Sequence, residues 1–159
     1  MDRVAIFPGS FDPFTVGHED IVLRSLDLFD KVIISVGYNS NKKEFFSVAK
    51  RVEWIKEIFW DNPKVLVRKY EGLTVDFATE VGARYILRGL RTSADFEYER
   101  AIAQVNKAMS KIDSVFLLTQ PEHTSVNSSI VRDIIKHGGD ASLFLPDKIK
   151  KRINDFMRK

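Results

Sequence analysis

The most informative feature of this chain is the stretch Val4-Ala5-Ile6-Phe7-Pro8-Gly9-Ser10-Phe11-Asp12-Pro13-Phe14-Thr15-Val16-Gly17-His18. Residues 4–7 are an apolar run typical of a buried strand, and a helical pattern begins near Gly17. Gly9 allows the backbone of the intervening turn to come close to a ligand. Because the start of a helix offers free N–H groups and the positive end of its dipole, it favours an anion. The stretch therefore predicts a phosphate site, and with it nucleotide chemistry.

The rest of the chain alternates short apolar runs with helical patterns. We expect strands at Val4–Phe7, Val32–Val36, Val65–Val67, Tyr85–Leu87 and Val115–Leu118. We expect helices at Gly17–Phe29, Ser47–Trp60, Leu73–Val81 and Ser93–Ser110, then from Ser125–Ser129 to His137, and from Pro146 onward. The helix at Ser93–Ser110 is expected to face inward through Ala101, Ile102, Val105 and Met109. This alternation predicts an α/β fold, a doubly wound five-stranded parallel sheet with helices on both faces, in a single domain over residues 1–159.

Composition excludes several classes of protein. The 159 residues are 44% hydrophobic and 30% charged, which are globular values. No apolar run approaches the roughly 20 residues of a membrane helix, and no signal-peptide pattern is present, so we expect no membrane partner and a cytoplasmic location. Without cysteine there is no disulfide, thiolate metal site or cysteine nucleophile. The net charge of +3 is spread over interspersed acids and bases, so nucleic acid is not an expected partner.

Polar candidates follow the strands, where ligands bind in doubly wound folds. They are Ser10, His18, Lys42, Arg88, Arg91, Ser128 and Ser129. His18 lies in the first helical turn, where its imidazole N–H could donate to a phosphate oxygen. A capping loop with an exposed histidine is the alternative, but the glycine- and proline-containing turn favours the functional interpretation.

Each of the other candidate residues also has an interpretation that involves no ligand. Arg88 and Arg91 bracket a glycine and could grip phosphate with two N–H groups each. They could equally pair with Asp95 and Glu99, and both interpretations can hold together. The hydroxyl-rich segment Ser125–Ser129 is as compatible with a helix cap as with a second anion site. Only its position favours Lys42, because most loop lysines are simply solvated.

Several familiar nucleotide and metal patterns are absent. The chain has no Gly-x-x-x-x-Gly-Lys-Ser/Thr loop and no Gly-x-Gly-x-x-Gly after the first strand. His18, His123 and His137 lack the spacing of metal ligands. We therefore expect no metal held by protein side chains.

At these residues the chain resembles the phosphopantetheine adenylyltransferases, nucleotidyltransferases that carry a Thr/His-x-Gly-His motif. The resemblance runs nearly from end to end. Its segments are Phe7–Pro13, Thr15–His18, Lys42, Gly72–Ala78, Arg88–Arg91, Asp95–Glu99 and Asn127–Arg132. The Arg-Gly-Leu-Arg loop followed by Asp-Phe-Glu-Tyr-Glu is the most specific of them. Residues Thr124–Ser129 depart from the family's usual aromatic followed by Ser-Phe-Ile-Ser-Ser-Ser.

This resemblance implies a Rossmann-like nucleotidyltransferase fold and a step of coenzyme A biosynthesis. ATP and 4′-phosphopantetheine would give dephospho-coenzyme A and pyrophosphate, with Mg²⁺ as cofactor. It also implies a cytoplasmic homohexamer inhibited by coenzyme A. The catalytic residues would be His18, Ser10, Lys42 and Arg91, and those for phosphopantetheine Ser10, Lys42, Thr74 and Arg88. Those for ATP would be Ser10, Phe11, His18, Gly89, Leu90, Arg91, Glu99, His123, Thr124, Ser125, Val126, Asn127, Ser128 and Ser129.

Two other functions stay open at this point. The chain could be another nucleotidyltransferase with a different phosphate acceptor, which the segment from Arg88 to Glu99 disfavours. It could also be a non-catalytic nucleotide-binding module, which the presence of both Ser10 and His18 disfavours. ATP binding without turnover of any acceptor would indicate the module.

Overall fold

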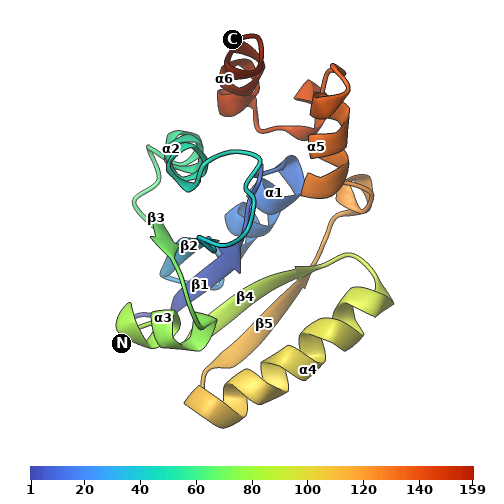
Figure 1. Ribbon diagram of the computed structural model, residues 1–159. Helices are drawn as coiled ribbons and strands as arrows, with labels where there is room; N and C mark the ends of the chain where they lie inside the picture. Colours follow the sequence, from blue (N-terminus) through green and yellow to red (C-terminus); the bar gives the residue numbers. More distant parts are fainter.

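The computed structural model describes residues 1–159 and contains one sheet of five parallel strands in the order β3-β2-β1-β4-β5 (Figure 1). The strands are β1 (Val4–Gly9), β2 (Lys31–Gly37), β3 (Val65–Tyr70), β4 (Tyr85–Leu90) and β5 (Asp113–Leu118). The central strand is β1, where Ala5 pairs with Val32 on one side and with Tyr85 on the other. The predicted five-stranded parallel sheet is confirmed.

Helices follow the strands in alternation. They are α1 (Val16–Ser25), α2 (Val48–Ile58), α3 (Thr74–Glu80), α4 (Ser93–Ser110), α5 (Ser128–Lys136) and α6 (Asp147–Met157), with short 3₁₀ turns at Pro121–His123 and Ser142–Phe144. None of these helices is both long enough and apolar enough to cross a lipid bilayer.

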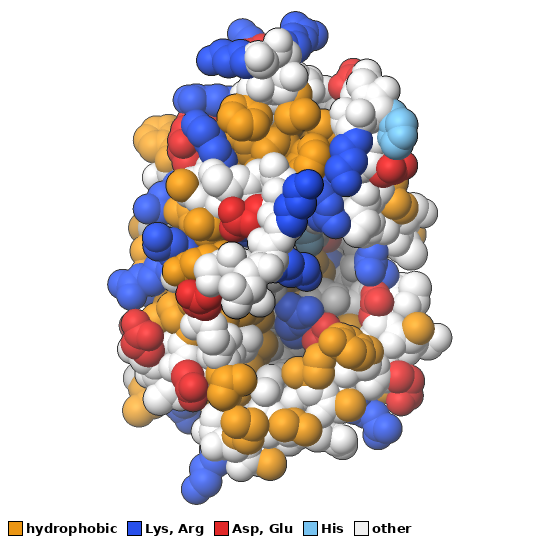
Figure 2. Space-filling model, in the orientation of Figure 1, with side chains coloured by type: hydrophobic (Ala, Val, Ile, Leu, Met, Phe, Trp, Pro, Cys, Tyr) orange, Lys and Arg blue, Asp and Glu red, His pale blue; other side chains and the backbone are white.

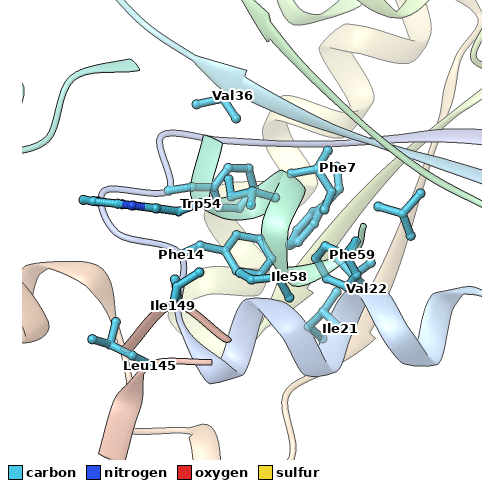
Figure 3. Close-up of a cluster of buried hydrophobic side chains, with 14 of the residues drawn as sticks. Phe7, Phe14, Ile21, Val22, Val36, Trp54, Ile58, Phe59, Leu145 and Ile149 are labelled. Carbon is cyan, nitrogen blue, oxygen red and sulfur yellow. The ribbon is translucent and has the colours of Figure 1, made fainter. Parts of the chain in front are cut away.

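The helices cover both faces of the sheet, because side chains alternate in direction along each strand. Ala5 and Phe7 of β1 belong to the larger core cluster, which includes buried residues of α1, α2, α5 and α6. Ile6, between them, belongs to a smaller cluster with Val75 and Phe77 of α3. Figure 3 shows the larger cluster, where Phe14 lies among side chains from several helices. The doubly wound arrangement is therefore confirmed.

Some helix ends differ from the sequence expectation. Helix α1 ends at Ser25 rather than Phe29, and α2 ends at Ile58 rather than Trp60. Phe29 is nevertheless buried, whereas the Trp60 side chain is 77% exposed. The apolar spacing continues past the end of each helix, because Phe29 after α1 and Phe59 after α2 also pack against the core, although Trp60 does not. Periodicity therefore overestimates the length of both helices.

Helix α4 has the expected bounds, but the expected inward face is wrong. Ala101, Ile102, Val105 and Met109 are all exposed, and the helix has no buried residue. The helix lies along β4 and β5 at the edge of the sheet (Figure 1). Apolar periodicity identifies a helical face but not the surface against which that face packs. In this chain the apolar face is exposed rather than packed in the core.

Candidate active site

A cavity of about 280 Å³ opens at the carboxyl ends of β1 and β4. The sequence candidates that line it are Ser10, Phe11, His18, Arg88, Gly89, Arg91, Glu99, Val126, Asn127 and Ser128. Figure 2 shows a hollow on this face with Lys and Arg side chains around it. The structure therefore brings hydrogen-bond donors from distant parts of the chain to one place. This place lies beyond the carboxyl ends of the strands, where the sequence predicted the site.

The turn between β1 and α1 has a fixed shape. A Cβ on Gly9 would lie 2.8 Å from Cζ of Phe11, a clash that only glycine avoids. Phe11 itself has φ 50°, in the left-handed region that few residues with a side chain adopt. The turn thereby presents the exposed Ser10 to the cavity.

His18 belongs to a capping box at the start of α1. The backbone N–H of Thr15 donates to Nδ1 of His18 at 3.0 Å, and the N–H of His18 donates to Oγ1 of Thr15 at 3.4 Å. Because Nδ1 accepts a hydrogen bond, the proton of a neutral imidazole must be on Nε2.

The surroundings of His18 favour its neutral form. The ring lies edge-on to Phe11 at 5.0 Å between centroids and tilted to Phe14 at 5.2 Å. Burial, together with the charges of Arg88 and Arg91, lowers the pKa of His18 to about 3. The residue therefore offers a neutral Nε2–H donor at ordinary pH.

Arg88 is held in a bidentate ion pair with Glu99 of α4. Its Nε donates to Oε2 of Glu99 at 2.9 Å, and its Nη2 donates to Oε1 at 2.7 Å. Nη1 donates to the carbonyl of Pro8 at 2.6 Å. Pro8, near the end of β1, begins the segment of residues 8–14 that leads into α1, which we call the phosphate turn because the sequence predicts a phosphate site there. Three of the five guanidinium N–H groups are thus engaged, and two stay available for an anion.

Arg91 forms the second pair that the sequence predicted. Its Nε donates to Oδ2 of Asp95 at 3.3 Å, and its backbone N–H donates to the same oxygen at 3.0 Å. Both arginines line the cavity while they pair with acids of α4. The ion-pair interpretation is therefore confirmed, and the binding interpretation stays a prediction that the position of both arginines at the cavity allows.

Two further cavities adjoin the first at the phosphate turn. One, of about 270 Å³, shares Ser10, Arg88 and Glu99 with the first and adds Thr74. The other, of about 530 Å³, shares Ser10 and adds Lys42. Ser10 lines all three cavities, so it marks the point at which they meet.

The remaining predicted residues do not line these three cavities. They are Leu90, His123, Thr124, Ser125 and Ser129. Leu90 is buried, and its carbonyl accepts a hydrogen bond from the hydroxyl of Thr119 at 2.9 Å. The hydroxyl of Ser129 accepts a hydrogen bond from Arg132 at 3.0 Å. In this segment Asn127 caps α5 by accepting from the N–H of Ile130 at 2.9 Å.

Sequence reasoning missed Arg132. Its Nη1 donates to the carbonyl of Asp12 at 2.8 Å, and the side chain lines both the first and the third cavity. It lies four positions after Ser128 on α5, so both residues share one helical face. That spacing was readable in the sequence and could have identified it.

Comparison with known proteins gives a consistent result. A family model described as cytidylyltransferase-like matches residues 6–134. Proteins named phosphopantetheine adenylyltransferase from Flavobacterium psychrophilum and Flavobacterium johnsoniae are each 53% identical over 148 residues, which is 93% of this chain and 98% or 97% of theirs. The protein of the same name from Cytophaga hutchinsonii is 51% identical over 150 residues, which is 94% of this chain and 100% of that one.

Solved structures share the fold. The chain superimposes, with a TM-score of 0.78 and 17% identity, on a bifunctional NMN adenylyltransferase/ADP ribose pyrophosphatase from Francisella tularensis. The match covers 100% of this chain and 51% of that protein, so this chain spans about half of its length. At this identity the likeness concerns the Rossmann-like nucleotidyltransferase fold alone.

Proposed function

Because this chain belongs to the phosphopantetheine adenylyltransferase family of cytidylyltransferase-like proteins, we propose that it transfers the adenylyl group of ATP to 4′-phosphopantetheine. The products are dephospho-coenzyme A and pyrophosphate. The observation that carries the proposal is the neutral imidazole of His18 at a helix start, in one cavity with Ser10, Arg88 and Arg91.

The reaction needs no covalent enzyme intermediate. An oxygen of the phosphopantetheine phosphate attacks the α-phosphorus of ATP and forms the new P–O bond. The bond from that phosphorus to the bridging oxygen breaks, and its electron pair leaves with pyrophosphate. The phosphate monoester is already anionic near neutral pH, so the protein needs to align two anions and offset their repulsion.

The residues divide this work among the adjoining cavities. We place ATP in the first cavity and phosphopantetheine in the second, so that the reacting phosphates meet at Ser10. Nε2–H of His18 would donate to an oxygen of the α-phosphate as negative charge develops there. Lys42, from the third cavity, and Arg91 would neutralise the transferring and leaving groups.

Mg²⁺ is the expected cofactor, and the donor set indicates how it would be held. The structure has no group of three or more His, Cys, Asp or Glu residues arranged to hold a metal ion. Three carboxylates border the first cavity, and all are engaged: Asp95 by Arg91, Glu99 by Arg88, and Asp12 by the backbone N–H groups of Phe45 and Phe46. The cavity therefore fits Mg²⁺ that would be held mainly by the triphosphate and would neutralise charge there, while Arg88, Arg91 and Arg132 supply the protein's own positive charge.

We also propose a homohexamer inhibited by coenzyme A, as the family resemblance implies. The exposed apolar face of α4 supports self-association, because exposed apolar surface of this kind typically marks an interface. Coenzyme A carries both the pantetheine and the adenine nucleotide of the product, so we expect it to inhibit by occupying the first two cavities. A cytoplasmic location stays a prediction.

A direct assay tests the function. The protein is incubated with ATP, Mg²⁺ and 4′-phosphopantetheine, and we expect dephospho-coenzyme A and pyrophosphate by mass spectrometry. Parallel reactions with CTP as donor and nicotinamide mononucleotide as acceptor test other transferases. Product from those pairs alone would replace the proposal, and ATP binding without any product would indicate a non-catalytic module.

A further inference from the structure

We propose that Arg51 is a positioning residue that holds the Lys42 loop, residues 38–46, against the phosphate turn so that the Lys42 ammonium reaches the reacting phosphates. This inference rests on the proposed function. Arg51 lies in the first part of α2, whose start is capped by the Ser47 hydroxyl accepting from the N–H of Lys50 at 3.2 Å. The cap fixes the start of α2 and with it the direction in which the Arg51 side chain extends from the helix.

The guanidinium of Arg51 connects three segments that are far apart in the chain. Nη1 donates to the carbonyl of Ser10 in the phosphate turn at 2.6 Å and to the carbonyl of Gly37 at the end of β2 at 3.2 Å. Nε donates to the carbonyl of Phe46, the last residue of the loop, at 3.0 Å. Arg51 therefore fixes both ends of the Lys42 loop relative to Ser10.

The charge of Arg51 is neutralised by an ion pair within the same network. The side chain is 3% exposed, so its charge needs a partner, and Nη2 pairs with Oε1 of Glu44 at 2.5 Å. Glu44 lies on the Lys42 loop, two residues after Lys42. The ion pair therefore holds the second half of the loop just after Lys42, and the carbonyl contacts hold its ends.

A second contact closes the loop onto the turn from the other side. The carboxylate of Asp12 accepts the backbone N–H groups of Phe45 at 2.9 Å and of Phe46 at 2.8 Å. Lys42 itself has an exposed side chain, which borders the third cavity together with Ser10. Its reach toward Ser10 is therefore set by the backbone of the loop, which Arg51 and Asp12 hold.

This arrangement explains why a buried arginine stands at position 51. A planar guanidinium can bind three carbonyls and a carboxylate at once, whereas a lysine ammonium has three donors and no fixed plane. A lysine at this position would keep the charge but lose part of the network. The loop would then sample other positions while the helix stays folded.

A double-mutant cycle tests the proposal through Lys42. We expect Arg51→Lys to lower kcat/KM by about 10- to 100-fold, the size of loss that follows a misplacement of about 1 Å. In a Lys42→Ala background the same change should lower kcat/KM further by less than about threefold. The proposal would be overturned if Arg51→Lys lowered kcat/KM by the same factor with and without Lys42→Ala. It would also be overturned if the Lys42→Ala variant were as active as the wild type.

Two further variants separate positioning from general destabilisation. Ile55→Val alters a buried residue one turn further along α2 that forms none of these hydrogen bonds, and it should lower Tm without the loss of kcat/KM. Glu44→Ala changes a partly exposed side chain, so it tests whether the loop is held in place even if Arg51→Lys does not fold. It should lower kcat/KM in the wild-type background, and it should have little further effect on kcat/KM in the Lys42→Ala background. Wild-type activity in Glu44→Ala would count against the proposal.

Hydrogen exchange gives a readout without substrate. In Arg51→Lys or Glu44→Ala, the amides of residues 38–46 should exchange at least several-fold faster, while those of Ile55 and Ile58 stay protected. Unchanged exchange in the loop would overturn the proposal. If the wild type makes no dephospho-coenzyme A, the proposed function fails, and the exchange result alone decides whether Arg51 holds the loop.

Discussion

The backbone N–H of Thr15 lies 3.0 Å from Nδ1 of His18 and donates to it. This one contact determines which ring nitrogen carries the proton, and it turns Nε2–H away from the helix backbone as the free donor. The same capping box starts α1. The capping box that starts α1 therefore also orients the His18 ring and places its proton on Nε2, the atom that we propose to donate to the α-phosphate.

His18→Ala should lower kcat by about 10²- to 10³-fold, the usual loss for one donor to a transition state, with a much smaller change of KM. The reason is that the donor acts mainly when charge develops on the α-phosphate. Steady-state kinetics measures both constants. His137→Ala, which alters an exposed histidine at the end of α5, is the matched control and should behave as the wild type. An unchanged kcat in His18→Ala would remove the residue from this role.

Stability should fall as pH decreases from about 6.5 towards about 3, in part because of His18. The folded protein resists protonation of this ring until its pKa of about 3, whereas the unfolded chain takes up the proton near the ordinary value of 6.5. Since the unfolded state then binds more protons in this window, the free energy of unfolding falls by up to about 1.4 kcal/mol for each pH unit. Above pH 6.5 this contribution is fully present.

Urea unfolding of the wild type and of His18→Gln between pH 4 and pH 7 measures this dependence. The free energy of unfolding of the variant should change less with pH than that of the wild type, because the variant lacks the group that titrates differently in the folded and unfolded states. Equal slopes would mean that His18 is not held neutral. The kcat/KM profile of the wild type should likewise show no inflection from His18 near pH 6.5.

Arg88→Ala should weaken phosphopantetheine more than ATP, by about 10- to 100-fold for the loss of a charged hydrogen-bonding group. Arg88 borders both cavities, but its Nη1, which donates to the carbonyl of Pro8, keeps a second N–H beside the turn that leads to Ser10, where we place the phosphopantetheine phosphate. Titration calorimetry with each ligand gives the two values of Kd. Arg84→Ala, at an exposed position just before β4, is the control. Equal losses for both ligands would contradict the assignment.

Val105→Glu should reduce the size of the assembly. Val105 is 57% exposed on the apolar face of α4, so a charge there would be buried without a partner if that face is an interface. Sedimentation velocity compares the variant with the wild type. Leu143→Glu adds the same charge to an exposed apolar residue outside α4 and should leave the assembly intact. A hexamer that survives Val105→Glu would place the interface elsewhere.

Local patterns in the sequence were sufficient for the fold and for much of the site. The apolar runs predicted each strand, and a parallel sheet then required their carboxyl ends to lie along one edge. That rule alone placed Ser10, His18, Arg88 and Arg91 together, and the structure confirms that they share a cavity. Asn127, in the segment that was interpreted as a possible helix cap, does cap α5.

Features that depend on local spacing and on the direction of the strands were therefore readable from the residues alone. The surface that each face meets was not. The apolar face of α4 is recognisable as a face, yet it is exposed, and Arg51 resembles an ordinary charged residue of a helix although it is buried against Ser10 and Gly37. The physical reason is that spacing along a chain fixes side-chain direction about its own helix or strand, whereas burial and partners depend on segments that are distant in the sequence.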